Sequence, residues 1–283
     1  MPRTPHDCGR RPTLAWQGCD RPRRSISWLR GRPAAGSCPY ELNDIKMDYF
    51  QAASAAPPGW RRYTLEDVAR LPNQYLATVP VAEREAAERG DAEAAERLRR
   101  ALFWPMVYEL EPQLWDAVSQ AEPIHPGILA KLEVEGRRVL EVAAGSGRLT
   151  VYLCPRADEL VCVEPSAGLR RILVTRCPSA DIRAGFAQAL PVEDGWAELT
   201  VCCASIQPDP RVVLELERVT APDGILMLIS PENPDWFQAR GWERLTFDPS
   251  DVVLNPHDPE LEKIVGPLDP PHELVWRERR HRR

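Results

Sequence analysis

The twelve residues VLEVAAGSGRLT (Val139–Thr150) are the part of this 283-residue chain that decides its fold. An apolar, strand-like run enters a glycine turn, and a helical stretch follows the turn. Gly145 and Gly147 let the backbone take unusual dihedral angles and let a ligand approach closely. In a doubly wound sheet, such a turn lies at the carboxyl edge of the strands, where ligands bind. The stretch therefore predicts a binding site at the end of a sheet strand.

Short apolar runs alternate with helical stretches on both sides of this turn, and four of the first five runs are mostly apolar, as parallel strands buried on both faces should be. Connections of this length suit βαβ units. Two later runs, separated by a proline-rich loop, complete the set. We predict an α/β fold with a doubly wound, Rossmann-like, mostly parallel seven-stranded sheet. The seven predicted strands are 138–143, 159–164, 180–184, 197–204, 224–230, 243–248 and 272–277, with a short helix in WFQARGW (236–242).

The residues before the sheet predict a helical N-terminal section, 47–133. Thr64 and Asp67 have the spacing of a capping box. Helical composition or periodicity then continues through 81–103, 106–120 and 126–132. We expect the ligand-binding domain itself to occupy residues 134–283.

Residues 1–46 differ from the rest, being rich in Arg, Pro, Gly and Trp without a helical or strand period. We expect a disordered extension here, with Met47 as the true start. This segment carries a charge of +5 within a chain of net charge −6, so the remainder is acidic at −11. An acidic body argues against nucleic acid as the main partner, because phosphate binding needs a basic face.

Composition also bears on membranes, metals and cellular location. No window of the sequence approaches the roughly 18 consecutive apolar residues that a membrane span needs. The eight cysteines include no C-x-x-C spacing, which gives no support to a zinc site. We therefore expect no membrane segment and no metal, and reduced thiols in a cytoplasmic protein.

Two classes of cofactor use a glycine turn of this kind. The dinucleotide fingerprint G-x-G-x-x-G needs a third glycine, and Thr150 stands at that position. Glu141 lies near the end of the strand, where a buried carboxylate is costly without a partner. A cationic ammonium group on a ligand would be such a partner, which favours a ligand with an amino-acid part over a dinucleotide.

The segment resembles motif I of the class I S-adenosylmethionine-dependent methyltransferases, an acidic residue followed by Gly-x-Gly, met here by Glu141, Gly145 and Gly147. Ala143 departs from the fuller pattern, which often has a further glycine there. The match is to the type 11-like, small-molecule group. The resemblance implies that S-adenosylmethionine is the cofactor and that the turn, including Ser146, contacts it.

Three further segments resemble the same family in the same order. Val161–Ser166 contains Glu164 and Pro165, with Glu164 at the end of the predicted strand. The resemblance implies that Glu164 binds the ribose hydroxyls. Gly185–Pro191 resembles the adenine-side loop, so that Phe186, Ala187 and Gln188 are expected near the adenine. Leu216–Leu226 resembles a structural run before the fifth strand, with Asp209 and Pro210 starting the helix and Asp223-Gly224 turning the chain.

The methyl acceptor is not named by any motif. We expect acceptor-side residues in the N-terminal helices and in the loop Ser205–Asp209, with Ser205 also near the cofactor. Trp104, Tyr108 and Trp115 suit either an aromatic acceptor pocket or ordinary helix packing, and packing is the more common use of such a stripe. His125 is either a base or, as we favour, a structural residue.

The sequence predicts a methyltransferase that acts on a small-molecule acceptor. Two alternatives stay open: a catalytically silent S-adenosylmethionine-binding module, suggested by Ala143 and Phe186, and an NAD-binding oxidoreductase, against which Glu141 and Thr150 count. No catalytic base and no oligomeric state can be assigned from the sequence.

Overall fold

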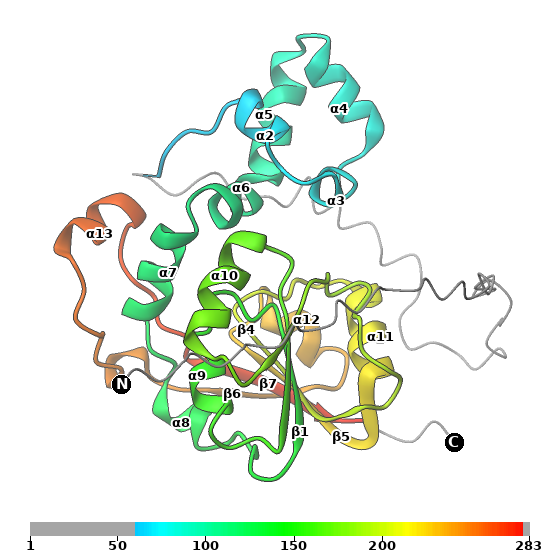
Figure 1. The fold of residues 1–283 in the computed structure, drawn as a ribbon, viewed down its shortest axis with the longest axis vertical. Helices are drawn as coiled ribbons and strands as arrows, with labels where there is room; N and C mark the ends of the chain where they lie inside the picture. The colour runs from blue at the N-terminus through cyan, green and yellow to red at the C-terminus, as the bar shows by residue number, and fades with distance from the viewer. Residues whose placement is uncertain (1–59, 280–283) are drawn as a thin grey trace, which may run out of the picture. The chain divides into compact units, whose positions relative to one another are not determined.

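A seven-stranded sheet is the centre of the computed structural model, which describes residues 60–279 (Figure 1). The strand order is β3-β2-β1-β4-β5-β7-β6, so the predicted doubly wound α/β fold is confirmed. The expectations for residues 1–46 and for Met47 lie outside the described residues. The strands are β1 (Arg138–Val142), β2 (Glu159–Val163), β3 (Asp181–Arg183), β4 (Ala197–Cys203), β5 (Thr220–Ile229), β6 (Glu243–Thr246) and β7 (Glu273–Glu278).

The direction of the strands decides at which edge of the sheet a ligand can bind. We call this edge, at the carboxyl ends of the parallel strands, the ligand edge. β1 pairs in parallel with β2 on one side and β4 on the other, so the winding reverses at β1. Ligands bind at such a reversal, outside the carboxyl ends of the strands. β7 instead runs antiparallel to β5, with Ile229 opposite Leu274. The start of β7 therefore lies at the same edge as the ends of the parallel strands.

Helices follow most of the strands, as the βαβ pattern predicts, although none lies between β3 and β4. They are α9 (Thr150–Leu153), α10 (Ala167–Arg176), α11 (Pro210–Val219) and α12 (Pro234–Gln238), followed by α13 (Pro259–Val265). Asp209 accepts a hydrogen bond from the Arg211 amide and Pro210 follows it, as expected for the start of α11. The predicted proline-rich loop before β7 contains α13, which the sequence analysis missed. Asp258 caps this helix and Pro259 occupies its first turn, a signal that the sequence does carry.

Residues 60–133, the described part of the predicted N-terminal helical section, contain helices that are shorter than the sequence pattern suggests. Gly90 has φ +91° and separates two helices within 81–103, and Pro112 begins a new helix within 106–120. The Thr64–Asp67 capping box is present. The helices are α2 (Leu65–Ala69), α3 (Asn73–Leu76), α4 (Val81–Glu88), α5 (Ala92–Ala101), α6 (Phe103–Leu110), α7 (Pro112–Ala121) and α8 (Pro126–Leu129).

Alternation along β1 assigns its side chains to the two faces of the sheet. Leu140 and Val142 pack into one buried cluster, with residues of α11. Val139 packs into the other, with residues of α9 and α10. Glu141 shares its face with Val139, so a carboxylate stands among the apolar side chains under α9. A third cluster holds the N-terminal helices together and includes Leu261 of α13.

One predicted boundary is wrong. β5 begins at Thr220, immediately after α11, rather than at residue 224. Asp223-Gly224 therefore does not turn the chain between two elements but lies inside the strand, where the register with β4 shifts between Ala197 and Leu199. A Cβ on Gly224 would stand 2.7 Å from Cγ2 of Thr220, so only glycine fits this irregularity. Within residues 60–279, every helix is too short or too polar to cross a membrane.

Candidate functional site

The glycine turn after β1 is held in a conformation that favours glycine. Gly145 and Gly147 have φ of +59° and +103°, and Ala143 takes φ +56° despite its side chain. The left-handed region costs a residue with a Cβ roughly 1–2 kcal/mol. Ala143 thus takes a backbone conformation that favours glycine, the residue that the fuller motif often has at this position.

The two glycines of the turn have different roles. A Cβ on Gly147 would stand 2.8 Å from Cδ1 of Leu173, so Gly147 lets the turn pack against α10. A Cβ on Gly145 would meet only Nε1 of Trp115, at 3.9 Å. Gly145 therefore faces space that a ligand can use, with an indole beside it.

Glu164 lies at the end of β2 and its carboxylate spans the gap to the glycine turn. Oε2 accepts a 2.8 Å hydrogen bond from the Gly145 amide, and Oε1 accepts one of 2.8 Å from the Ser166 amide. The side chain is buried, and this burial raises its pKa to about 7. An ionised carboxylate has about four acceptor positions, so positions remain for two hydroxyl groups.

Glu141 is buried to 1% exposure, as its place in β1 requires. Oε2 accepts a 2.6 Å hydrogen bond from Oγ1 of Thr150 and lies 3.6 Å from Sγ of Cys162. Burial raises the pKa of Glu141 to about 8, and the nearby Glu164 charge adds to the rise. Thr150 therefore supplies a hydrogen-bond partner for the buried Glu141 carboxylate within the protein. Contact between Glu141 and a ligand ammonium group stays a prediction.

Ser146 and Pro165 complete the turn region. Ser146 is 1% exposed, and its Oγ has no hydrogen-bond partner in the described residues. A buried hydroxyl without a partner is unfavourable by about 1–3 kcal/mol, which a bound polar ligand would relieve. Its carbonyl accepts from Arg176, which fixes the turn to α10. Pro165 is half-buried between Glu164 and Ser166.

The predicted adenine-side loop lies against the N-terminal section. The Phe186 ring meets the Tyr75 ring edge-on at 5.3 Å, and Phe186 forms an isolated bridge with Ala189. Ala187 is half-buried and Gln188 is exposed. Phe186 is thus placed for an apolar contact with a ring, whereas Gln188 is exposed.

The N-terminal helices contact the loop after β2 directly. Oγ of Ser166 donates to the Tyr108 carbonyl at 2.9 Å, and Oε1 of Glu109 accepts from the Ala167 amide at 3.2 Å. The hydroxyl of Tyr75 donates to the same Glu109 carboxylate at 3.3 Å. This section therefore covers the end of β2 and the Glu164 carboxylate.

The aromatic residues of α6 and α7 pack mainly on each other. The Trp104 ring lies 5.4 Å from Trp115 and 6.0 Å from Tyr108, and all three belong to the N-terminal cluster. Helix packing is therefore the main role of this stripe. Trp115 is the member that also reaches the ligand edge, where it lines a cavity.

A cavity of about 310 Å³ opens beside the glycine turn. It is lined by Trp115, Arg148, the ends of β4 and β5, and the segment Asp269–Glu273 before and at the start of β7. Acceptor-side residues were expected in the N-terminal helices and in Ser205–Asp209. Trp115 of the first group lines this cavity, whereas Asp269–Glu273 were not anticipated. Ser205 is exposed, and its hydroxyl donates to the Cys203 carbonyl at 3.1 Å. The antiparallel direction of β7, which brings Asp269–Glu273 to this edge, has no signature in the sequence.

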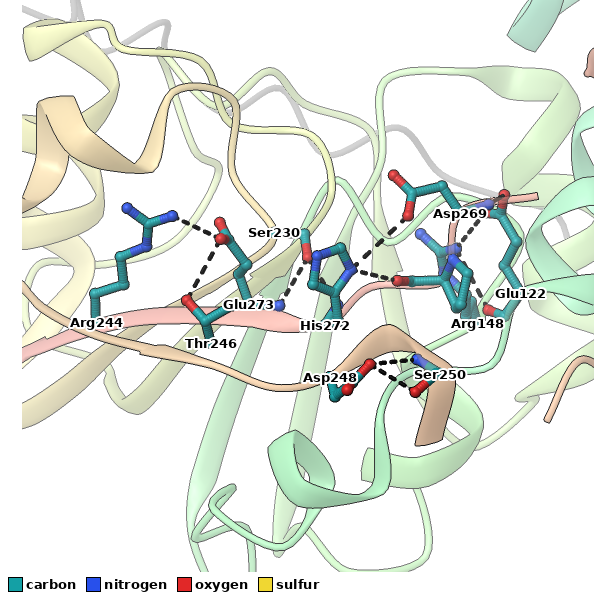
Figure 2. A network of polar contacts seen from close by, with 11 residues as sticks. Glu122, Arg148, Ser230, Arg244, Thr246, Asp248, Ser250, Asp269, His272 and Glu273 are labelled. Carbon is teal, nitrogen blue, oxygen red and sulfur yellow. Dashed lines mark hydrogen bonds and ion pairs between the residues drawn. The ribbon is translucent and has the colours of Figure 1, made fainter. Parts of the chain in front are cut away.

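Glu122 joins the glycine turn to that segment (Figure 2). Oε2 accepts from Nη1 of Arg148 at 3.1 Å, and Oε1 accepts from the Asp269 amide at 2.9 Å. Burial raises the pKa of Glu122, although the Arg148 charge opposes this rise. Glu122 thus connects Arg148, beside the glycine turn, to Asp269 in the wall of the cavity.

His125 has a structural role, as favoured from the sequence. Its Nδ1 accepts from the Gly127 amide at 2.9 Å and so caps α8. The ring stacks on Phe247 with centroids 4.7 Å apart, and Nε2 lies 3.9 Å from Asp251. His125 is not among the residues that line the cavity beside Trp115.

Comparison with known proteins places this geometry in a family. The model of a family described as a methyltransferase domain matches residues 139–224, from β1 to the first half of β5. Residues 139–224 of this chain are therefore similar to a methyltransferase domain. The match covers the glycine turn, Glu164 and the adenine-side loop, which are the segments that the resemblance in sequence identified.

Proteins named as methyltransferases are similar to parts of this chain. A protein of Schizosaccharomyces pombe named an uncharacterized methyltransferase is 33% identical over 34% of this chain and 39% of its own length. An uncharacterized methyltransferase of Mycobacterium tuberculosis is 28% identical over 53% of this chain and 61% of its own. A demethylmenaquinone methyltransferase of Renibacterium salmoninarum is 30% identical over 36% of this chain and 44% of its own. The chain thus matches less than two thirds of the length of each relative.

Proposed function

We propose that this chain binds S-adenosylmethionine at the Gly145 turn and transfers its methyl group to a small-molecule acceptor. The observation that carries the proposal is the Glu164 carboxylate, which stands 2.8 Å from the Gly145 amide and has acceptor positions left over. In this assignment Glu164 binds both ribose hydroxyls. Each such charged hydrogen bond contributes about 1.5–3 kcal/mol.

The other proposed contacts follow from the same geometry. The methionine part lies along Gly145, with the Ser146 hydroxyl as its polar partner, and Phe186 packs on the adenine. When bound, S-adenosylmethionine supplies an activated methyl group on a sulfonium. The residues of the chain hold the acceptor in line and exclude water, and such positioning lowers a barrier by about 7–11 kcal/mol.

Calorimetric titration with S-adenosylmethionine and with S-adenosylhomocysteine tests the proposal. We expect both to bind, and Glu164→Ala to weaken both at least tenfold, a loss of about 1.4 kcal/mol or more. Glu159→Ala is the matched control, because Glu159 lies at the exposed start of the same strand. Equal affinity of Glu164→Ala and wild type would remove Glu164 from the site, and binding of NAD alone would favour an oxidoreductase.

Ala143 suggests a test of the alternative that the domain binds the cofactor without catalysis. Ala143 takes the left-handed conformation that glycine favours, so its side chain is compatible with the turn as it stands. We therefore expect turnover in a methyl-transfer screen of small phenols, amines and carboxylates. Binding of the cofactor without transfer to any member of the screen would support the silent module.

A further inference from the structure

His272 stands at the ligand edge because of the direction of β7. It directly precedes Glu273, the first residue of that strand. Oγ of Ser230, at the end of β5, accepts from the His272 amide at 3.1 Å and from the Glu273 amide at 3.2 Å. The backbone of His272 is thus fixed beside the carboxyl end of a parallel strand, next to Ser230 (Figure 2), and His272 is among the residues that line the cavity beside Trp115.

The hydrogen bond at Nδ1 determines the tautomer of this imidazole. Nδ1 lies 2.9 Å from the Pro270 carbonyl, which can only accept. Nδ1 therefore carries a proton, and in the neutral ring Nε2 has a free lone pair. Within residues 60–279, no group hydrogen-bonds to Nε2. The ring is held by one nitrogen and has the other available as a base.

The wall of the cavity has an apolar part and a polar part, which suits a flat molecule with a ring and a polar group. Trp115 contributes an indole, and Pro231, Pro270 and Pro271 contribute apolar surface. A volume of about 310 Å³ lies at the lower end of the range for small-molecule sites. The guanidinium of Arg148 also lines the cavity, where it is paired with the Glu122 carboxylate.

The charged groups around His272 are mostly paired with one another. Glu273 accepts from Arg244 at 2.6 Å, and Glu122 accepts from Arg148 at 3.1 Å. Asp269 is exposed, and its Oδ1 lies 3.8 Å from Nδ1 of His272, on the side away from Nε2.

We propose that this cavity binds a phenol-type hydroxyl acceptor and that Nε2 of His272 removes its proton. This inference rests on the proposed function and names its substrate class. The hydroxyl proton passes to Nε2, and the acceptor oxygen uses its electron pair to form the new bond to the methyl carbon. The former carbon–sulfur pair stays on sulfur, which leaves S-adenosylhomocysteine and an aryl methyl ether. The imidazolium then returns its proton to solvent.

Binding of 4-nitrophenol to protein loaded with S-adenosylhomocysteine tests this without turnover, because the phenolate is visibly coloured. At a pH where the free phenol is mostly protonated, we expect wild-type protein to bind it and to increase the phenolate absorbance severalfold. His272→Asn should lose that increase, since the Asn amide keeps a donor to the Pro270 carbonyl but has no base at Nε2. His257→Asn is the matched control, because His257 contacts Asn255 and Glu262 instead of lining the cavity.

The outcomes separate this inference from the proposed function. An unchanged affinity of His272→Asn for S-adenosylhomocysteine shows that the variant is folded, and His272→Gln is the second variant if it is not. Equal phenolate absorbance in His272→Asn and wild type, or no binding of 4-nitrophenol, overturns the inference and leaves the cofactor site intact. Failure of wild-type protein to bind S-adenosylhomocysteine overturns the proposed function and this inference with it.

Discussion

Oγ1 of Thr150 donates a 2.6 Å hydrogen bond to Oε2 of Glu141. Thr150 is the residue that breaks the dinucleotide fingerprint, and Glu141 is the acidic residue of the methyltransferase motif. Thr150 thus departs from the dinucleotide fingerprint and also supplies a hydrogen bond to the buried carboxylate of the methyltransferase motif. Both side chains are at most 1% exposed, so solvent cannot replace the bond.

Loss of that hydroxyl should destabilise the protein. Thr150→Val keeps the shape of the side chain but leaves Glu141 with one weak sulfur contact, and an unsatisfied buried polar group costs about 1–3 kcal/mol. We expect a decrease of that size in the free energy of unfolding measured with urea. Thr175→Val is the control, because Thr175 is exposed on α10. Equal stability of the two variants would show that the bond contributes little.

Protonation of Glu141 should make stability depend on pH. Its pKa in the folded protein, about 8, lies above the value of about 4.3 for an unfolded chain, so the folded state holds the proton more tightly. This contribution is fully present below the unfolded pKa and is lost as the pH rises to 8, with a slope of at most about 1.4 kcal/mol per pH unit.

Glu141→Gln isolates this effect, because its amide oxygen still accepts from Thr150 and does not titrate. We expect the free energy of unfolding of Glu141→Gln to fall less than that of wild type between pH 6 and pH 8. Glu159→Gln, at the exposed start of β2, should follow wild type. Parallel pH curves for wild type and Glu141→Gln would contradict a raised pKa at Glu141.

The two turn glycines should respond differently to alanine. Gly147→Ala places a Cβ 2.8 Å from Leu173 at φ +103°, so we expect a loss of several kcal/mol in stability. Gly145→Ala meets no close contact, and we expect a loss of about 1 kcal/mol with a larger loss of S-adenosylmethionine affinity. Thermal unfolding and calorimetry measure the two effects. Equal losses of stability in the two variants would contradict the assignment of Gly147 to packing and of Gly145 to ligand approach.

Ala143 offers a stabilising substitution. Because its φ is +56°, Ala143→Gly removes the strain of a Cβ in the left-handed region, and we expect a gain of about 1 kcal/mol in unfolding free energy. Ala144→Gly is the matched control, since Ala144 is buried and has an ordinary φ, and it should lose stability. A loss of stability in Ala143→Gly as well would show that the methyl group of Ala143 packs favourably.

The sequence alone determined the sheet and the turn. Strands buried on both faces are apolar throughout, and glycines mark a turn because few other residues take its backbone angles, so β1, Gly145 and Gly147 can be recognised locally. The approximate position of Glu164 follows from the same local pattern. Breaks at Gly90 and Pro112 and the cap at Asp258 were also visible in the sequence, although only the structure showed their consequence.

Only the tertiary structure decided which distant residues meet at the ligand edge. Glu122, Arg148 and Asp269 come from three separate segments and meet because α7, the glycine turn and the approach to β7 converge there. His272 reaches the cavity because β7 runs antiparallel to β5. Strand direction depends on long-range pairing, which leaves no periodicity or spacing in the chain, so the residues proposed to act on the acceptor were not predictable from it.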